Sequence, residues 1–334
     1  MQNKLIRYQA TAALLLSLLV VMLGAYTRLT DAGLGCPDWP GCYGHMVLPS
    51  AHDDLINAQN TYPQIPIESK KAWTEMVHRY AAGTLALLIF FISFFLLRQR
   101  IKRINVPWHL PVALLLLVIF QAALGMWTVT LKLLPVVVMG HLLGGMLIVA
   151  CLSRLRLQVS SVQGRNLPQW RPWLCLAVII VFLQIALGGW VSSNYAGISC
   201  IGFPLCNGEW LPKLYFAQGF NLFSPVGANY QGGLLDHDVR VTIQFIHRVG
   251  AVITMFYILT LSLIMLVRER FNYLRAAAMV MGLLVLLQFT LGILNVIYLL
   301  PIDVAVAHNG IAALLLATVF SSLHLTRKEL NNAG

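Results

Sequence analysis

Four histidines lie within apolar stretches of the chain, at His78, His141, His247 and His308. An ionisable side chain inside a membrane-spanning helix is costly enough to indicate a function. Each histidine is expected about 3 to 6 residues inside the outer end of its helix, so all four lie at nearly one depth. Two imidazoles from two helices of a bundle can ligate one haem iron. The pattern predicts two bis-histidine haem sites; zinc or another metal, helix packing and a proton relay are the alternatives.

Arg79 and Arg248 each follow one of these histidines directly. A guanidinium group forms strong charge-assisted hydrogen bonds with carboxylates. We therefore predict that both arginines contact haem propionates near the outer interface. Small residues close to the histidines are expected to leave room for a porphyrin. They are Gly83, Gly144, Gly145, Gly250 and Gly310.

Glu75 stands three residues before His78, so on a helix the two side chains share a face. The equivalent position before His247 is Gln244, which does not ionise. This asymmetry indicates that one half of the chain performs chemistry and the other holds a cofactor. The alternative is that Glu75 is an acidic residue in the first turn, stabilised there by the helix dipole.

Four of the six cysteines form two Cys-x5-Cys pairs, Cys36 with Cys42 and Cys200 with Cys206. Both pairs are expected in outer loops, where oxidising conditions allow disulfides to persist. A disulfide that braces each loop is the favoured interpretation, with a redox role and zinc binding as alternatives.

The composition requires these residues to be positioned by membrane helices. The 334 residues are 58% hydrophobic and 10% charged, against roughly 45–50% and 25% in soluble proteins, which excludes a soluble enzyme and a disordered chain. Stretches long enough to span the roughly 30 Å hydrocarbon core occur at residues 8–26, 76–97, 108–130, 136–153, 172–192, 241–267, 276–299 and 304–325. The predicted fold class is an all-α membrane protein with eight transmembrane helices, the first of them retained and not cleaved as a signal peptide.

The basic residues predict the orientation. If the N-terminus is cytoplasmic, 15 of the 23 Lys and Arg residues but only two of the 12 acidic residues fall on the cytoplasmic side. Both termini are therefore predicted to be cytoplasmic, with the histidines near the outer face. The net charge of +11 then reflects the membrane topology, and we expect no nucleic-acid partner.

The chain also repeats itself with a period of roughly 164 to 169 residues. Residues 19–44 align with 183–208, residues 76–79 with 245–248, and residues 121–141 with 288–308. Because each repeat has an even number of helices, both enter the membrane from the same side. The sequence thus predicts two parallel-repeat four-helix bundles, residues 1–167 and 168–334.

These features together resemble the bacterial heme A synthase family, which includes the mitochondrial enzyme that hydroxylates haem O. The resemblance rests on GAYTRLTDAGLGCPDWPGCYG at residues 24–44, the Glu75-x-x-His78-Arg79 motif, the duplicated units and the four histidines. It implies oxidation of the C8 methyl group of haem O to a formyl group by two successive hydroxylations, which gives haem A for cytochrome c oxidase.

The resemblance also implies a role for each half. His247 and His308 would hold a permanent haem b as cofactor, and His78 and His141 would hold the haem O substrate. Glu75 would stabilise a cationic intermediate or handle a proton. The implied partners are a haem O synthase, which is a farnesyltransferase, as supplier, and an electron-transfer partner. The implied location is the bacterial cytoplasmic (inner) membrane, with the haem sites near the periplasmic face; a homo-oligomer stays open.

Two other functions compete with this interpretation. A two-haem electron carrier similar to a cytochrome b should place its haems at opposite membrane faces, whereas all four histidines are predicted near the outer face. A haem exporter or chaperone fits the outer location but does not explain Glu75.

Overall fold

The computed structural model describes residues 2–63, 65–102, 104, 106–160 and 164–327, and in them it contains helices, turns and loops but no β-strand. Eight of its helices are long and apolar enough to cross a membrane. They are α1 (Gln2–Leu29), α3 (Ser69–Ile101), α4 (His109–Thr130), α5 (Pro135–Gln158), α6 (Arg171–Ser193), α8 (His237–Arg268), α9 (Asn272–Ile297) and α10 (Ile302–Leu325). The predicted fold class, all-α with eight spanning helices, is confirmed for the residues described.

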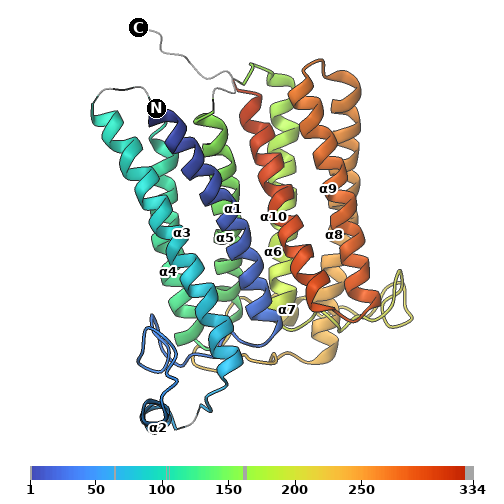
Figure 1. Cartoon of the computed structure of the whole chain (residues 1–334). Coiled ribbons are helices and arrows are strands. Elements are labelled where there is room, and N and C mark those ends of the chain that lie inside the picture. Colours follow the sequence, from blue (N-terminus) through green and yellow to red (C-terminus); the bar gives the residue numbers. More distant parts are fainter. Residues whose placement is uncertain (1, 64, 103, 105, 161–163, 328–334) are drawn as a thin grey trace.

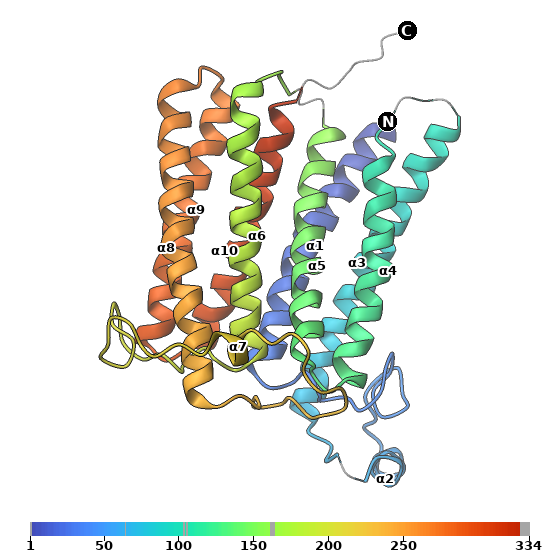
Figure 2. The ribbon, with the colours of Figure 1, turned by 180° about the vertical axis from the view of Figure 1, so that it is seen from behind.

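The long helices form two neighbouring groups of four (Figures 1 and 2). The first group contains α1, α3, α4 and α5, and the second contains α6, α8, α9 and α10. At the seam, α10 packs against α1 and α5, and α5 also packs against α6. Val21, Met146 and Ala313 are among the buried residues that fill this seam. The groups correspond to residues 1–167 and 168–334, and their treatment as two domains stays an interpretation.

Equivalent positions of the two groups share an unusual backbone conformation. After α1 and α6 the chain turns through Asp31 (φ 51°) and Tyr195 (φ 53°), and after α4 and α9 through Lys132 (φ 49°) and Leu299 (φ 54°). Positive φ angles are uncommon for residues other than glycine. Their recurrence at matched positions supports the internal repeat seen in the sequence.

Short turns place two of the histidines near helix starts. Residues 131–134 join α4 to α5, and residues 298–301 join α9 to α10, so each pair runs antiparallel. Pro135 is at the start of α5, where its missing N–H costs nothing. His141 and His308 are therefore each the seventh residue of their helix.

The other two histidines lie further along their helices than predicted. The helices α3 and α8 begin at Ser69 and His237, not at residues 76 and 241. His78 and His247 are consequently the tenth and eleventh residues of these helices. The prediction of 3 to 6 residues was wrong here, because helical hydrogen bonding continues through polar first turns that a search for apolar stretches leaves out.

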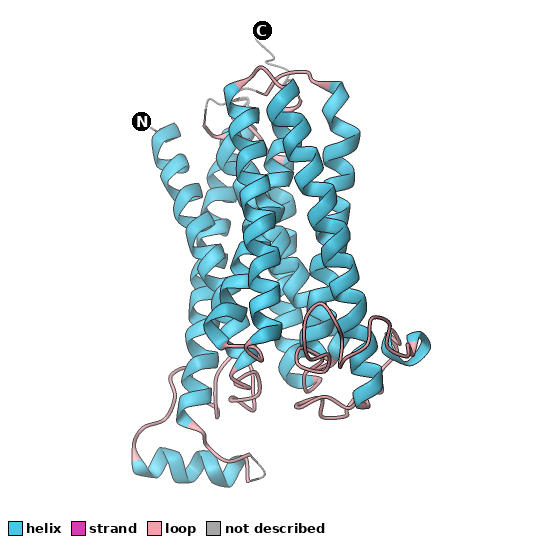
Figure 3. Cartoon of the chain, turned by 90° about the vertical axis from the view of Figure 1, so that its right-hand side faces the viewer, coloured by secondary structure: helices cyan, strands magenta, loops and turns pink. Residues whose placement is uncertain are grey.

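The helix α1 begins and α10 ends at one end of the bundle, and both long loops lie at the other end (Figures 1 and 3). These loops contain the short helices α2 (His52–Thr61) and α7 (Phe216–Gly219), and a 3-10 turn, η1 (Pro168–Trp170), precedes α6. Which end faces the cytoplasm stays a prediction from the basic residues. Two of them, Arg103 and Lys328, lie outside the described residues.

Candidate functional site

A cavity of about 1340 Å³ lies among the helices of both groups. Sites for one small molecule are typically about 300–1,000 Å³, so this cavity has room for a ligand in each group. Every predicted site residue except the cysteines lines it. These residues are Glu75, His78, Arg79, His141, His247, Arg248 and His308.

The first histidine pair comes from α3 and α5. The ring centres of His78 and His141 are 6.5 Å apart, with the ring planes at 87°. A metal ion about 2 Å from a nitrogen of each ring would separate the centres by roughly 6 Å, so one iron ion fits between them. Among the described residues, the Nδ1 atoms of both rings, and that of His308 in the second pair, are buried without a side-chain hydrogen-bond partner. Buried polar atoms of this kind are costly, and they fit a site that a ligand completes.

The second pair, from α8 and α10, has amide partners. The Nε2 of Gln184 lies 3.1 Å from His247 Nδ1 and donates to the His247 carbonyl at 3.0 Å. The Nε2 of Gln288 lies 3.2 Å from His308 Nε2. Outer partners of this type orient metal-ligating histidines. The second pair therefore also fits a haem iron, and its rings are held by the protein itself.

All four imidazoles pack against glycines. Each histidine faces a glycine on the preceding long helix, and a Cβ at that glycine would lie 3.0 to 3.4 Å from the imidazole Cε1. The pairs are Gly24 with His78, Gly125 with His141, Gly188 with His247, and Gly292 with His308. Sequence reasoning did not select these glycines, although all four were matched in the repeat alignment.

The glycines that were selected have several different roles. A Cβ on Gly144 would lie 1.7 Å from Gln121 Nε2, and a Cβ on Gly250 would lie 2.3 Å from Gln184 Oε1. These two glycines therefore make room for glutamines beside the histidines. Gly145 and Gly310 face α1 side chains, whereas a Cβ on Gly83 would meet nothing within 4 Å.

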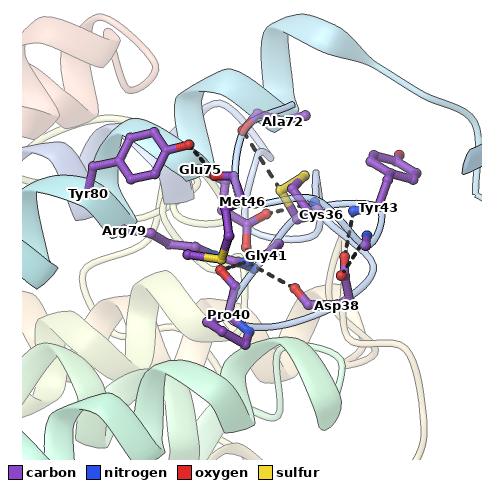
Figure 4. Close-up of a disulfide and its surroundings, with 12 residues drawn as sticks. Cys36, Asp38, Pro40, Gly41, Tyr43, Met46, Ala72, Glu75, Arg79 and Tyr80 are labelled. Atoms are coloured by element: carbon purple, nitrogen blue, oxygen red, sulfur yellow. Dashed lines mark hydrogen bonds and ion pairs between the residues drawn. A yellow bond between two sulfur atoms is a disulfide. The ribbon is translucent and has the colours of Figure 1, made fainter. Parts of the chain in front are cut away.

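Glu75 connects α3 to the first outer loop (Figure 4). Its side chain is buried, with the residue 4% exposed. Its Oε2 accepts a hydrogen bond from the Cys36 N–H at 2.9 Å, and its Oε1 forms an ion pair with Arg79 at 2.5 Å. The alternative of a helix-dipole position was wrong, because α3 begins at Ser69 and Glu75 lies beyond its first turn, where the dipole acts.

Both arginines bind the loop of their own group. Arg79 donates to the carbonyls of Asp38, Pro40 and Gly41, and Arg248 donates to those of Cys200, Gly202 and Leu205. Each guanidinium lines the cavity while holding a loop over it. Contact with haem propionates stays a prediction for these two residues.

Both predicted disulfides are present, Cys36–Cys42 and Cys200–Cys206. All four cysteines are buried, and each bridge closes a turn at which Arg79 or Arg248 binds backbone carbonyls. The zinc alternative is therefore excluded for these sulfur atoms. The first bridge also places the Cys36 N–H against Glu75.

Two further cationic side chains line the cavity and were missed. Arg28, at the end of α1, donates to the Ser192 carbonyl at 2.7 Å and stacks on Tyr195. Arg240, in the first turn of α8, has a buried Nε without a partner. In the sequence both are merely basic residues at the ends of apolar stretches, a position that most often reflects topology.

Comparison with known proteins agrees with this geometry. Residues 7–320 match the model of the COX15-CtaA family, described as cytochrome oxidase assembly protein. The chain belongs to this family. A heme A synthase of Shewanella oneidensis is 45% identical over 313 residues, which cover 92% of each chain. A heme A synthase of Caulobacter sp. is 30% identical, over 90% of this chain and 89% of that one, and one of Neorickettsia sennetsu is 27% identical, over 93% and 96%.

The COX15-CtaA match includes both histidine pairs, Glu75 and both disulfides. The resemblance inferred from residues 24–44 and the histidines is thus confirmed at the level of the family. The role of each individual residue is not tested by the match.

Proposed function

We propose that this protein is a heme A synthase, which oxidises the C8 methyl group of haem O to a formyl group for cytochrome c oxidase. One observation carries the proposal: two histidine pairs line one cavity, and a buried carboxylate, Glu75, stands beside the first pair, where the second has an amide. The similarity to heme A synthases over most of both chains supports the same reaction.

The second group is proposed to hold haem b as the resident cofactor, through His247 and His308. Its rings have the partners Gln184 and Gln288, which suit a ligand that stays bound. When bound, haem b supplies a one-electron redox centre. The first group is proposed to bind the haem O substrate through His78 and His141, which line the same cavity as Glu75.

Glu75 is the proposed catalytic residue. Oxidation of a methyl to a formyl group adds oxygen and removes electrons and protons, so positive charge or a proton must be accommodated near the methyl carbon. A buried carboxylate can do either, because its interactions are strong where water is excluded. Arg79 and the Cys36 N–H hold both carboxylate oxygens in place. If water supplies the oxygen, each hydroxylation releases two electrons and two protons, and the electrons go to an electron-transfer partner. If O₂ supplies the oxygen, that partner instead delivers two electrons for each hydroxylation, and the second oxygen atom leaves as water.

The setting of the reaction follows from the topology. We propose a multi-pass protein of the bacterial inner membrane, with its haem sites near the periplasmic face and both termini in the cytoplasm. A haem O synthase is the proposed supplier of the substrate. The bilayer gives haem O, with its apolar farnesyl tail, a route to the helices.

The direct test is to identify the product. The protein is expressed with and without a haem O synthase, in cells that make no other heme A synthase, and the haems are extracted and separated. We expect hydroxylated haem and haem A only when haem O is supplied. An electron carrier or an exporter would return haem b or unmodified haem O, and that result would contradict the proposal.

A further inference from the structure

The two groups differ in the wall that separates the cavity from lipid. In the first group the lining residues on this side come from α3 and α4, and in the second from α8 and α9. At three matched wall positions the first group has small side chains and the second has large ones, whereas Tyr80 and Leu85 are larger than their counterparts Val249 and Thr254. The matched pairs are Gly83 and Val252, Ala86 and Met255, and Ala122 and Phe289, and all six residues line the cavity.

The small side chains leave a crevice between α3 and α4. Gly83 and Ala122 are exposed and also line the cavity; of their second-group counterparts, Val252 is likewise exposed and lines it. A Cβ added to Gly83 would meet nothing within 4 Å. In addition, α3 packs against α4 less extensively than α8 packs against α9. In the second group the partly buried Phe289 fills the position equivalent to Ala122.

A buried polar group marks the inner side of this crevice as a ligand site. Gln121 directly precedes Ala122, lines the cavity and is only 9% exposed, yet its Nε2 has no hydrogen-bond partner. The equivalent Gln288 contacts His308. The Oε1 atoms of Gln184 and Gln288 in the second group also lack a partner among the described residues. Such buried amide atoms are costly, and in the first group the unpartnered amide lies beside the small side chains of the wall. This combination suits a ligand with a polar ring and an apolar chain.

The depth of the crevice suits a hydrocarbon chain. Gly83 and Ala86 follow His78 by one to two helical turns, so they lie about 7 to 12 Å deeper in the membrane than the imidazole. A chain leaving the ring edge in that direction meets apolar side chains and then the lipid interior. Each buried methylene contributes about 0.8 kcal/mol to binding.

We propose that the crevice formed by Gly83, Ala86 and Ala122 binds the farnesyl tail of haem O and thereby selects haem O over haem b. This inference rests on the proposed function, because it assigns the tail of that substrate. The second group, whose wall is filled by Val252, Met255 and Phe289, accepts only a haem without the tail.

The test measures binding and needs no turnover. The purified protein with haem b in its second site is titrated with haem O and, separately, with haem b, and absorbance reports occupation of the first site. The variants carry the second-group residues: Gly83→Val, Ala86→Met and Ala122→Phe, singly and together. Leu87→Phe and Leu116→Phe, at exposed positions outside the cavity lining, are the matched controls.

In the wild type we expect tighter binding of haem O than of haem b at the first site. The triple variant should weaken haem O binding about tenfold or more while changing haem b binding at that site little, and the controls should change neither. If the triple variant does not fold, Gly83→Val gives the same comparison, since its added atoms enter open space at the Cβ. Equal affinities in the wild type, or equal weakening of both haems in the variants, would overturn the proposal.

His78→Ala separates this inference from the function on which it rests. Loss of haem O binding in this variant, together with tail selectivity in the wild type, supports both. Unchanged haem O binding would show that the first group is not the substrate site, which overturns the proposed function and the tail site with it. Loss of binding without any selectivity for the tail would overturn the tail site alone.

Discussion

His78 in the first group and His247 in the second occupy equivalent positions, and each ring packs against a glycine of the preceding helix. Their neighbours are not equivalent. Gln184 contacts His247, whereas valine, at position 20, occupies the matched place in the first group. Glu75 forms an ion pair, whereas Gln244 donates to the Gly197 carbonyl at 3.2 Å. The glycines beside the imidazoles are therefore shared between the groups, whereas the polar neighbours of the imidazoles differ.

The outer loops show the same contrast. Both contain a disulfide and both are held by an arginine. Only Arg79 also has a carboxylate partner; the described contacts of Arg248 are with backbone carbonyls. A change in the first loop is therefore expected to affect the carboxylate of Glu75, whereas the second loop contacts no matching acid.

The largest expected effect comes from removing one histidine from each group. His247→Ala should abolish the low-spin haem b spectrum of the purified protein, because the iron loses an axial ligand. His78→Ala should leave that spectrum in place and abolish haem A formation. Absorbance spectra and extracted haems measure both. A full haem b spectrum in His247→Ala would contradict the assignment of haem b to the second group.

Glu75→Gln makes the first group resemble the second at the position that distinguishes them. Haem binding should stay intact, and haem A formation should fall by about 100-fold or more, as expected when a catalytic acid or base is lost. The measurement is haem A per purified protein in cells that supply haem O. Glu68→Gln is the control, because Glu68 is an exposed acid of the same loop paired with Lys71. An unchanged yield from Glu75→Gln would leave Glu75 as a purely structural partner of Arg79.

Gln184→Val gives the second group the valine of the first. Loss of an outer partner of a ligating histidine typically lowers metal affinity about 10- to 100-fold, so the variant should lose haem b faster when challenged with an apo-haem-binding protein. The reciprocal Val20→Gln should slow haem O dissociation from the first site. If the Gln184→Val protein retains haem b as the wild type does, the amide does not explain why one group keeps its haem.

The smallest effect concerns Tyr43, whose equivalent in the second loop is the non-ionising Asn207. Tyr43 is 2% exposed, and its hydroxyl donates to the Pro66 carbonyl at 3.2 Å. Burial, followed by the charges of Glu68, Asp38 and Glu75, raises the pKa of Tyr43 above its ordinary value. Above the ordinary pKa of about 10, the unfolded loop releases the proton first, so the free energy of unfolding falls as pH rises.

Limited proteolysis of the first loop between pH 8 and 11 measures this effect. The wild type should become sensitive more steeply above pH 10 than Tyr43→Phe, which loses about 1 kcal/mol at neutral pH but has no proton to release. Because Asn207 does not ionise, the second loop should show no matching increase in proteolysis above pH 10. Identical pH profiles for the wild type and Tyr43→Phe would show that ionisation of Tyr43 does not affect the stability of the first loop.

The helices and the histidines that line the cavity were predictable because their signals are local. Eight apolar stretches can only be helices in lipid, and a histidine inside such a stretch stands out whatever surrounds it. The repeat aligned Glu75 with Gln244 and brought out the asymmetry before any coordinates. The spacing of Cys36 from Cys42, and of Cys200 from Cys206, likewise predicted bridges that the structure contains.

The sequence by itself therefore determined the membrane helices, the histidine pairs, the disulfides and the position of Glu75, which has no acidic counterpart in the second group. Only the tertiary structure decided what the long polar side chains touch. Arg79 and Arg248 have flexible stems with several donors, so their partners depend on where distant loops fold, and here these are backbone carbonyls. The contacts of Gly24 and Gly188, and the open wall at Gly83, likewise arise from the packing of separate helices, which no local pattern of residues encodes.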